Sequence, residues 1–255
     1  MSESDKHRAR IFMHRGDLLQ ARAAWEAAVK DDRLTGTPRD LSNSLGNLGN
    51  TCALAGEFEK AEACYKEVLA IQRTEQDPHA IAHTLVNLGN LHVGAGRHEK
   101  ARPYYLEALD LLKPLHDHRA LGILYHNLAM EEARQQNWDE AVRLFQQALD
   151  SHRVVGSEEG LAATYSQLGK TFLDCGRSVE AERCFNNATE HFIKLGNPAG
   201  EAAVMRELAD LYEQRGDRVS AIRCMERLHH LALGTGRAPS PEDKARLARL
   251  RAAGG

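Results

Sequence analysis

The sequence repeats itself every 40 residues, without slippage, over most of its length. The run LGNLGN at residues 45–50 returns as NLGN at residues 87–90. One slot of the repeat holds Leu48, Leu88, Leu128, Leu168 and Leu208, and the next holds Gly49, Gly89, Ala129, Gly169 and Ala209. A fixed period of this length is typical of stacked units, each of which buries its apolar face against its neighbours.

Each unit is predicted to be a pair of helices. The first helix (helix A) starts at a polar residue that is often followed by proline, a pattern that favours a helix N-terminus. These starts are Thr37-Pro38, Asp77-Pro78, Asp117-His118, Ser157-Glu158 and Asn197-Pro198. A turn glycine then separates helix A from the second helix (helix B), and only Gln136 departs from glycine in that slot. The small residues at Gly49 and Ala61 and their equivalents are expected where the two helices cross closely.

The repeat resembles the tetratricopeptide repeat, whose pattern is W-x2-L-G-x2-Y followed by A-x3-F. Residues 165–172 (YSQLGKTF) and 181–185 (AERCF) match most of its slots. The unit is longer than the usual length of about 34 residues and is most similar to the variant in kinesin light chains, Partner-of-Inscuteable-type scaffolds and bacterial regulators. The resemblance implies an all-α, right-handed superhelical solenoid of about six repeats, over residues 1–36, 37–76, 77–116, 117–156, 157–196 and 197–233. Residues 234–255 are expected to form a linker and a C-terminal capping helix.

Composition and charge limit the classes of function. The net charge of −3 argues against a general nucleic-acid binder, which needs a basic surface to displace counterions from phosphate. The polar N-terminal sequence and the absence of a long apolar run predict a cytoplasmic protein. The five cysteines, without paired spacing, fit reduced thiols in that compartment.

Several motifs that resemble chemical sites are interpreted as structural. Gly169-Lys170-Thr171 is no phosphate loop, because Thr164 stands where that motif needs another glycine. Cys64, Cys184 and Cys224 share a slot that also accepts alanine, tyrosine and leucine, as a packing position does. The strongest metal candidate is a histidine group without a metal-ligand motif; it comprises His79, His83, His116, His118 and His126. The sequence therefore predicts no enzyme activity, no cofactor and no metal.

If the resemblance holds, helix A lines the concave groove. One groove slot holds His7, Asn47, Asn87, Asn127, Gln167 and Glu207, and a second holds Arg10, Asn50, Asn90, Met130, Lys170 and Asp210. His83, His126 and Arg206 are counted with the same groove. A carboxamide both donates and accepts hydrogen bonds, so a ladder of asparagines is suited to reading the backbone of an extended peptide. The alternative is that these asparagines bond to adjacent turns and hold helix A in register.

Charge is graded along this groove. The first helix is basic, with Lys6, Arg8, Arg10 and Arg15, and the sixth helix A is acidic, with Glu201, Glu207, Asp210 and Glu213. A partner with opposite charges at its two ends would complement that gradient. Capture of a C-terminal carboxylate, which some members of the family perform, is not expected because Lys170 and Arg134 stand alone.

The sequence thus predicts a non-enzymatic scaffold that holds a peptide segment of another protein, with no nucleic-acid or membrane partner. Two alternatives stay open. One is a regulatory sensor whose superhelix responds to a small peptide or effector, and the other is a homo-oligomeric assembly module.

Overall fold

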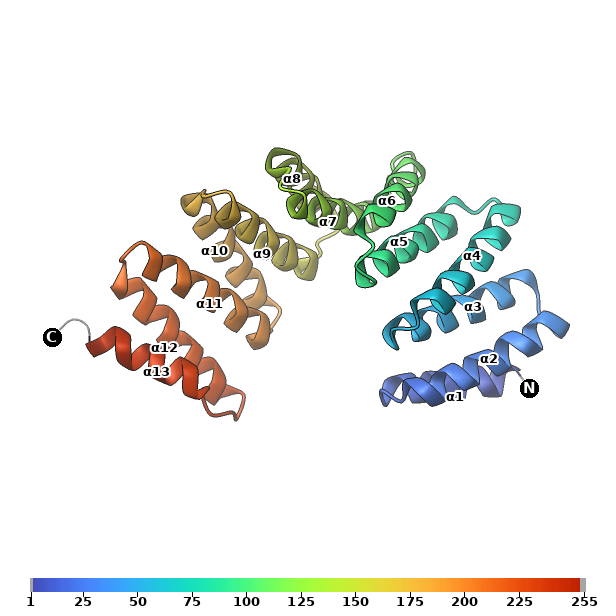
Figure 1. Cartoon of the computed structure of the whole chain (residues 1–255), viewed down its shortest axis with the longest axis horizontal. Helices are drawn as coiled ribbons and strands as arrows, with labels where there is room; N and C mark the ends of the chain where they lie inside the picture. Colours follow the sequence, from blue (N-terminus) through green and yellow to red (C-terminus); the bar gives the residue numbers. More distant parts are fainter. Residues whose placement is uncertain (1, 253–255) are drawn as a thin grey trace. The chain divides into compact units, whose positions relative to one another are not determined.

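The computed structural model describes residues 2–252, which form thirteen helices and no β-strand (Figure 1). Met1 and residues 253–255, which the sequence assigns to the ends of the array and of the tail, lie outside the described residues. The helices are α1 (Ser2–His14), α2 (Leu18–Thr35), α3 (Pro38–Leu54), α4 (Phe58–Glu75), α5 (Pro78–Gly94), α6 (His98–Leu112), α7 (His118–Arg134), α8 (Trp138–Val154), α9 (Glu158–Asp174), α10 (Ser178–Lys194), α11 (Pro198–Gln214), α12 (Arg218–Gly234) and α13 (Pro241–Ala252). The prediction of an all-α repeat array with a C-terminal helix is confirmed.

The helix starts follow from capping chemistry. The side chains of Thr37, Asp77, Ser157 and Asn197 each accept a hydrogen bond from the backbone N–H three residues on. Asp117 does the same for Ala120 at the start of α7. These bonds satisfy donors that have no partner within the helix, which fixes where each helix A begins.

The turns between helices A and B use the left-handed backbone region. Gly56 has a φ of 77°, and Gln136 adopts a φ of 63° in the equivalent slot. That region is sterically easy for glycine and costly for other residues. Gln136 therefore holds a conformation that the sequence pattern reserves for glycine.

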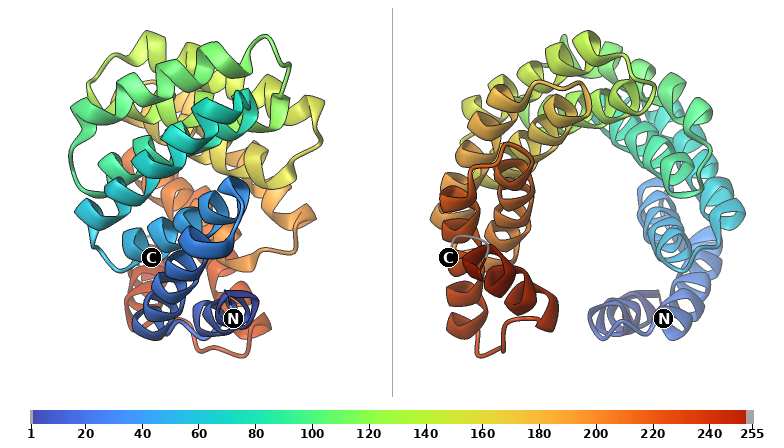
Figure 2. Two further views of the ribbon diagram at one scale, coloured as in Figure 1. Left: turned by 90° about the vertical axis from the view of Figure 1, so that its right-hand side faces the viewer. Right: turned by 60° about the vertical axis from the view of Figure 1, so that its left-hand side comes forward.

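The chain divides into two compact units, residues 1–124 (unit 1) and 125–255 (unit 2). Within each unit, successive helices pack as antiparallel hairpins, and helix pairs follow one another in chain order (Figure 2). The packed neighbours include α3 with α4 and α4 with α5 in unit 1, and α9 with α10 and α10 with α11 in unit 2. No described helix is long and apolar enough to cross a lipid bilayer.

In three of the helix pairs, a glycine of helix A meets a large ring of helix B where the helices cross. A Cβ atom added to Gly89 would lie 2.2 Å from Cε1 of Tyr105, and one added to Gly169 would lie 2.6 Å from Cε1 of Phe185. Both rings are buried, as is the preceding leucine of the slot, including Leu128 at 2% exposure. The expected close crossing is therefore confirmed, and the ring of helix B occupies the space that a side chain would need.

The LGNLGN run gives a matched test of this crossing. A Cβ on Gly49 would lie 2.7 Å from Cε1 of Tyr65, whereas a Cβ on Gly46, one turn earlier in α3, meets nothing within 4 Å. Gly49→Ala is expected to lower the free energy of unfolding by about 1–3 kcal/mol, because the buried ring must move. Gly46→Ala is expected to raise it by up to about 1 kcal/mol, because alanine is the better helix former. Urea unfolding of both variants measures the difference, and equal effects would contradict the crossing described here.

Candidate functional site

The exposed side of helix A in unit 1 carries the predicted amide ladder. We call this surface the A-face of unit 1, defined by His7, Arg10, Asn43, Asn47, Asn50, His83, Asn87 and Asn90. All of these residues are exposed except Asn87, which is half-buried. The structure therefore places three of the four ladder asparagines of this unit, together with His83 and Arg10, at exposed helix-A positions, and Asn87 at a half-buried one.

Three of these asparagines are engaged by the protein itself. The hydroxyl of Tyr65 donates to Oδ1 of Asn50 at 2.6 Å, and the hydroxyl of Tyr105 donates to Oδ1 of Asn90 at 2.7 Å. Both tyrosines are buried in helix B, so Asn50 and Asn90 satisfy hydroxyls of the core. Nδ2 of Asn47 donates to the carbonyl of Asn43 at 2.8 Å. The alternative role of the asparagines, as structural bonds, thus describes part of what these side chains do.

Asn87 sits beside a small hollow in unit 1. The hollow has a volume of about 190 Å³ and is lined by Ala53, Leu54, Phe58, Tyr65, Asn87, Asn90, Leu91 and Gly94. Its lining combines apolar side chains with two carboxamides. It lies among α3, α4 and α5.

Unit 2 has a more apolar pocket on its own helix-A side. Its volume is about 240 Å³. Its walls are apolar or small, with Phe185, Phe192, Val204, Ala163, Ala203 and Gly200. Its rim is polar, with His126, Ser166, Gln167, Lys170 and Glu207. Four predicted site residues therefore meet at this pocket, and we call this surface the A-pocket of unit 2.

The rim charges of the A-pocket are matched to each other. Nζ of Lys170 in α9 lies 3.0 Å from Oε1 of Glu207 in α11. The lysine side chain is 47% exposed, so the pair is open to solvent and to an incoming ligand. Exposed pairs contribute little to stability, so a ligand can replace either partner at small cost.

His126 is held between core and pocket. Its Nδ1 lies 3.0 Å from Oγ1 of buried Thr164, and its ring meets Phe145 edge-on. Burial, with a smaller contribution from His152, lowers the pKa of His126 to about 4. The imidazole is therefore neutral at physiological pH and can present only neutral donors or acceptors to a ligand.

Four predicted site residues of unit 2 do not line the A-pocket. Met130 is exposed at 37% and Asn127 is half-buried, both on α7. Arg206 forms an ion pair with Asp243 of α13 at 3.1 Å, and Asp210 forms one with Arg246 of α13 at 2.5 Å. These two groove residues are therefore paired with the C-terminal tail and do not line the A-pocket.

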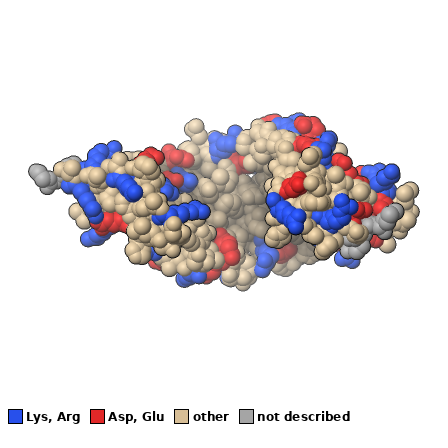
Figure 3. All heavy atoms as spheres, turned by 90° about the horizontal axis from the view of Figure 1, so that it is seen from below, with Lys and Arg blue, Asp and Glu red and all other residues tan. Residues whose placement is uncertain are grey.

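The acidic end of the predicted charge gradient is neutralised within unit 2. Glu207 pairs with Lys170, Asp210 with Arg246, and Glu201 with Arg227 at 2.6 Å. Figure 3 shows Lys and Arg interspersed with Asp and Glu on the face that it draws. In unit 1 the exposed face of α1 gathers positive charge in a shallow hollow lined by His7, Arg10, Ile11, His14 and Arg15.

The histidines and cysteines that resemble chemical sites in the sequence do not form a metal site or reactive thiols among the residues described below. Nδ1 of His79 lies 3.4 Å from Oδ2 of Asp117, and among residues 2–252 no three His, Cys, Asp or Glu side chains gather as metal ligands do. Burial raises the pKa of the Cys64 thiol to about 11 and that of the Cys184 thiol to about 12. These thiols are therefore protonated at neutral pH, which agrees with packing positions.

The contact of Phe192 with Gly200 at this pocket was not found from the sequence. Phe192 lines the A-pocket, and a Cβ on Gly200 would lie 2.3 Å from its Cε1, so the glycine admits the ring. The equivalent glycine, Gly160, lies over His152 in the same way. The spacing of 40 between Gly160 and Gly200 was a visible signal for this second close contact.

The sequence of the chain matches a known family of repeat proteins. The sequence profile of the Tetratricopeptide repeat family matches residues 1–74, 80–153 and 160–232, most of the chain. The chain belongs to the tetratricopeptide repeat family. Arrays of this family are in general protein-interaction scaffolds. A search of curated proteins finds no match.

Solved structures show the same fold at low identity. BtubC (BKLC) from P. vanneervenii is 24% identical with a TM-score of 0.78, over 88% of this chain and 94% of that chain. The nearly identical TPR-like repeats of a Podosopora anserina protein, reported as a kinesin light chain, are 20% identical with a TM-score of 0.65, over 80% and 100% of the two chains. The APC/C hetero-tetramer Cut9-Hcn1 contains a chain that is 16% identical with a TM-score of 0.64, over 94% of this chain and 40% of that chain. The resemblance to kinesin light chain repeats is therefore confirmed at the level of fold.

The two asparagines beside the hollow of unit 1 should behave differently. Asn90→Ala is expected to lower the free energy of unfolding by about 1–3 kcal/mol, because the buried hydroxyl of Tyr105 loses its acceptor. Asn87→Ala should change it by less than about 0.5 kcal/mol, because within residues 2–252 no core group bonds to that amide. Denaturant unfolding measures both values. Adding Tyr105→Phe to Asn90→Ala should recover part of the loss, and strict additivity of the two changes would contradict the bond.

Protonation of His126 should make folding sensitive to pH. The unfolded chain takes up this proton near pH 6.5 and the folded chain near pH 4, so stability falls as the pH is lowered through that window. Between pH 7 and pH 5 the wild type should lose about 2 kcal/mol more than His126→Gln, at 1.36 kcal/mol for each pKa unit. The control is His230→Gln, at an exposed position of α12. Parallel stability curves for the wild type and His126→Gln would overturn this assignment.

Proposed function

We propose that this protein is a non-enzymatic scaffold whose helix-A side binds an extended peptide segment of a partner protein. The observation that supports it best is the A-pocket of unit 2, where phenylalanine and valine walls meet an amide, an ammonium and a carboxylate at the rim. Apolar pockets with a few convergent polar groups are typical ligand sites. A peptide that places one apolar side chain in this pocket fits both its walls and its rim.

The polar rim is suited to a peptide backbone beside that side chain. Gln167 offers a carboxamide that can donate and accept, and Lys170 and Glu207 offer one donor and one acceptor group. Because the lysine and the carboxylate are paired with each other, they carry no net charge. The proposed segment is therefore recognised by its apolar anchor and its backbone more than by its charge.

Unit 1 supports the same proposal with different chemistry. Asn87 and Asn90 line its hollow, and the exposed Arg10 of α1 and Arg15, directly after α1, line another. A segment or partner surface that carries acidic residues would complement α1 electrostatically. A continuous ladder from Asn47 through Asn127 stays a prediction, because Asn127 belongs to unit 2.

The proposal is tested with a library of random peptides displayed on phage. Peptides enriched on the wild type should share an apolar residue and should bind with measurable affinity by fluorescence polarisation. Ala203→Trp, which fills the A-pocket from an exposed position, should weaken binding by roughly ten- to a hundredfold, a loss of about 1.4–2.8 kcal/mol. The matched control is Ala27→Trp, at an exposed position of α2. Selected peptides that bind both variants as tightly as the wild type would refute binding at the A-pocket.

A further inference from the structure

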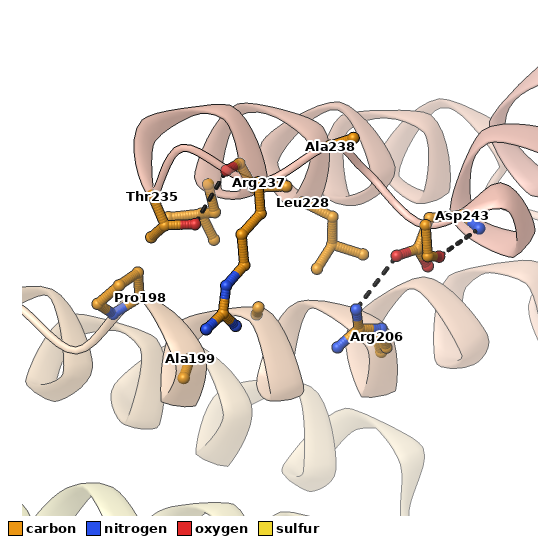
Figure 4. A pocket seen from close by; sticks show the side chains of 12 residues that line it. Pro198, Ala199, Arg206, Leu228, Thr235, Arg237, Ala238 and Asp243 are labelled. Carbon is orange, nitrogen blue, oxygen red and sulfur yellow. Dashed lines mark hydrogen bonds and ion pairs between the residues drawn. The ribbon is translucent and has the colours of Figure 1, made fainter.

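A second cavity in unit 2 lies beneath the C-terminal tail, away from the A-pocket. Its volume is about 530 Å³, within the range of about 300–1,000 Å³ found for small-molecule sites. Figure 4 shows it between α11, the end of α12 and the segment that leads into α13. We call it the tail cavity, defined by Pro198, Ala199, Ala202, Arg206, Leu228, Leu231, Ala232, Thr235, Arg237, Ala238, Ser240 and Asp243.

The tail that covers this cavity is held by buried leucines and by ion pairs. Two side chains of α13, Leu247 and Leu250, are buried. Arg246 pairs with Asp210 and Glu213, and Arg249 pairs with Glu213 at 3.2 Å. Protein interiors are normally close-packed. The half-buried side chains of Ala202, Leu231 and Ala232 nevertheless line open space here, which leaves apolar surface available to a ligand.

The polar groups of the tail cavity are mostly committed to the protein. Oγ1 of Thr235 donates to the carbonyl of Ala232, and Oγ of Ser240 accepts from the N–H of Asp243. Arg206 pairs with Asp243. Arg237 is exposed and extends from the tail segment across the cavity toward Ala199 (Figure 4). Its guanidinium has no ion-pair partner among the described residues.

The electrostatics of this cavity favour an anion. Its lining carries two arginines and one aspartate, a formal charge of 2 − 1 = +1. The N-terminal turn of α11, at Pro198 and Ala199, adds the positive end of a helix dipole. A guanidinium beside apolar walls is well matched to a carboxylate on an apolar body, because its planar donors bind both carboxylate oxygens.

We propose that the tail cavity binds an apolar monocarboxylate, with its hydrocarbon chain against Leu231 and Ala202 and its carboxylate on Arg237. Arg206 provides a second, weaker contact because Asp243 already neutralises it. Binding joins the tail segment to α11 through the ligand. This site and its ligand are independent of the peptide surface proposed above.

The experiment uses the full chain with sodium octanoate as probe. Octanoate should raise the melting temperature and bind in calorimetry, since a ligand of the native state stabilises it by mass action. Octanamide and octylammonium, which keep the chain but change the head group, should bind at least tenfold more weakly. Acetate, which keeps the head group without the chain, should also bind at least tenfold more weakly.

Three variants locate the site. Arg237→Gln should weaken octanoate binding about tenfold or more without lowering the melting temperature of the free protein. Ala199→Phe, which fills the cavity opposite Arg237, should abolish binding. Arg223→Gln, at an exposed position of α12, is the charge-matched control and should bind normally. Absence of octanoate binding, equal binding of octanamide, or unchanged binding by Arg237→Gln would each overturn the proposal.

Discussion

The whole array depends on the close crossing of helix A and helix B. At Gly49, Gly89 and Gly169 the crossing leaves no room for a Cβ atom, because an aromatic ring fills the space. In two repeats that ring is a tyrosine, whose hydroxyl reaches through to Asn50 or Asn90 on the exposed side. The crossing thus couples the core to the A-face of unit 1. Burial raises the pKa of Tyr65 to about 12, so the phenol stays a donor and its asparagine stays an acceptor.

Much of the fold was predictable because its determinants are local and periodic. The caps at Thr37 and Asn197 and the small-residue slot at Gly49 depend on side-chain type and spacing alone, and a 40-residue period displays them repeatedly. Contacts between slots were harder to foresee. In the sequence, Tyr65 follows Asn50 by fifteen residues. The hydroxyl points toward the amide only because of the side-chain rotamer that Tyr65 adopts in the packed core. Propensity and spacing carry no information about that choice.

The candidate site was partly predictable for the same reason. Gln167, Lys170 and Glu207 occupy the expected slots and meet at one pocket. Arg206 and Asp210 occupy equally regular slots, yet their partners come from α13, which breaks the period. His126 also follows the pattern, but its environment is set by Thr164 and Phe145 from other helices. The 40-residue period therefore predicts which face of its helix a side chain occupies. The residues that contact it from distant parts of the sequence determine its charge and its hydrogen bonds.

Both proposed ligand sites of unit 2 involve α11. Ala203 and Glu207 of that helix line the A-pocket, and Ala202 and Arg206, one residue earlier in each case, line the tail cavity. Adjacent positions on a helix point about 100° apart, so one helix serves two surfaces with different chemistry. The A-pocket is lined by neutral groups and by an ion pair, whereas the lining of the tail cavity carries a net positive charge. The last described helix, α13, packs against α12 through Leu247 and Leu250 and is joined to α11 by the part-buried ion pairs of Arg246 and Asp243. A ligand in the tail cavity therefore contacts both α11 and the tail segment, whereas a ligand of the A-pocket contacts α9 and α11 within the repeat array.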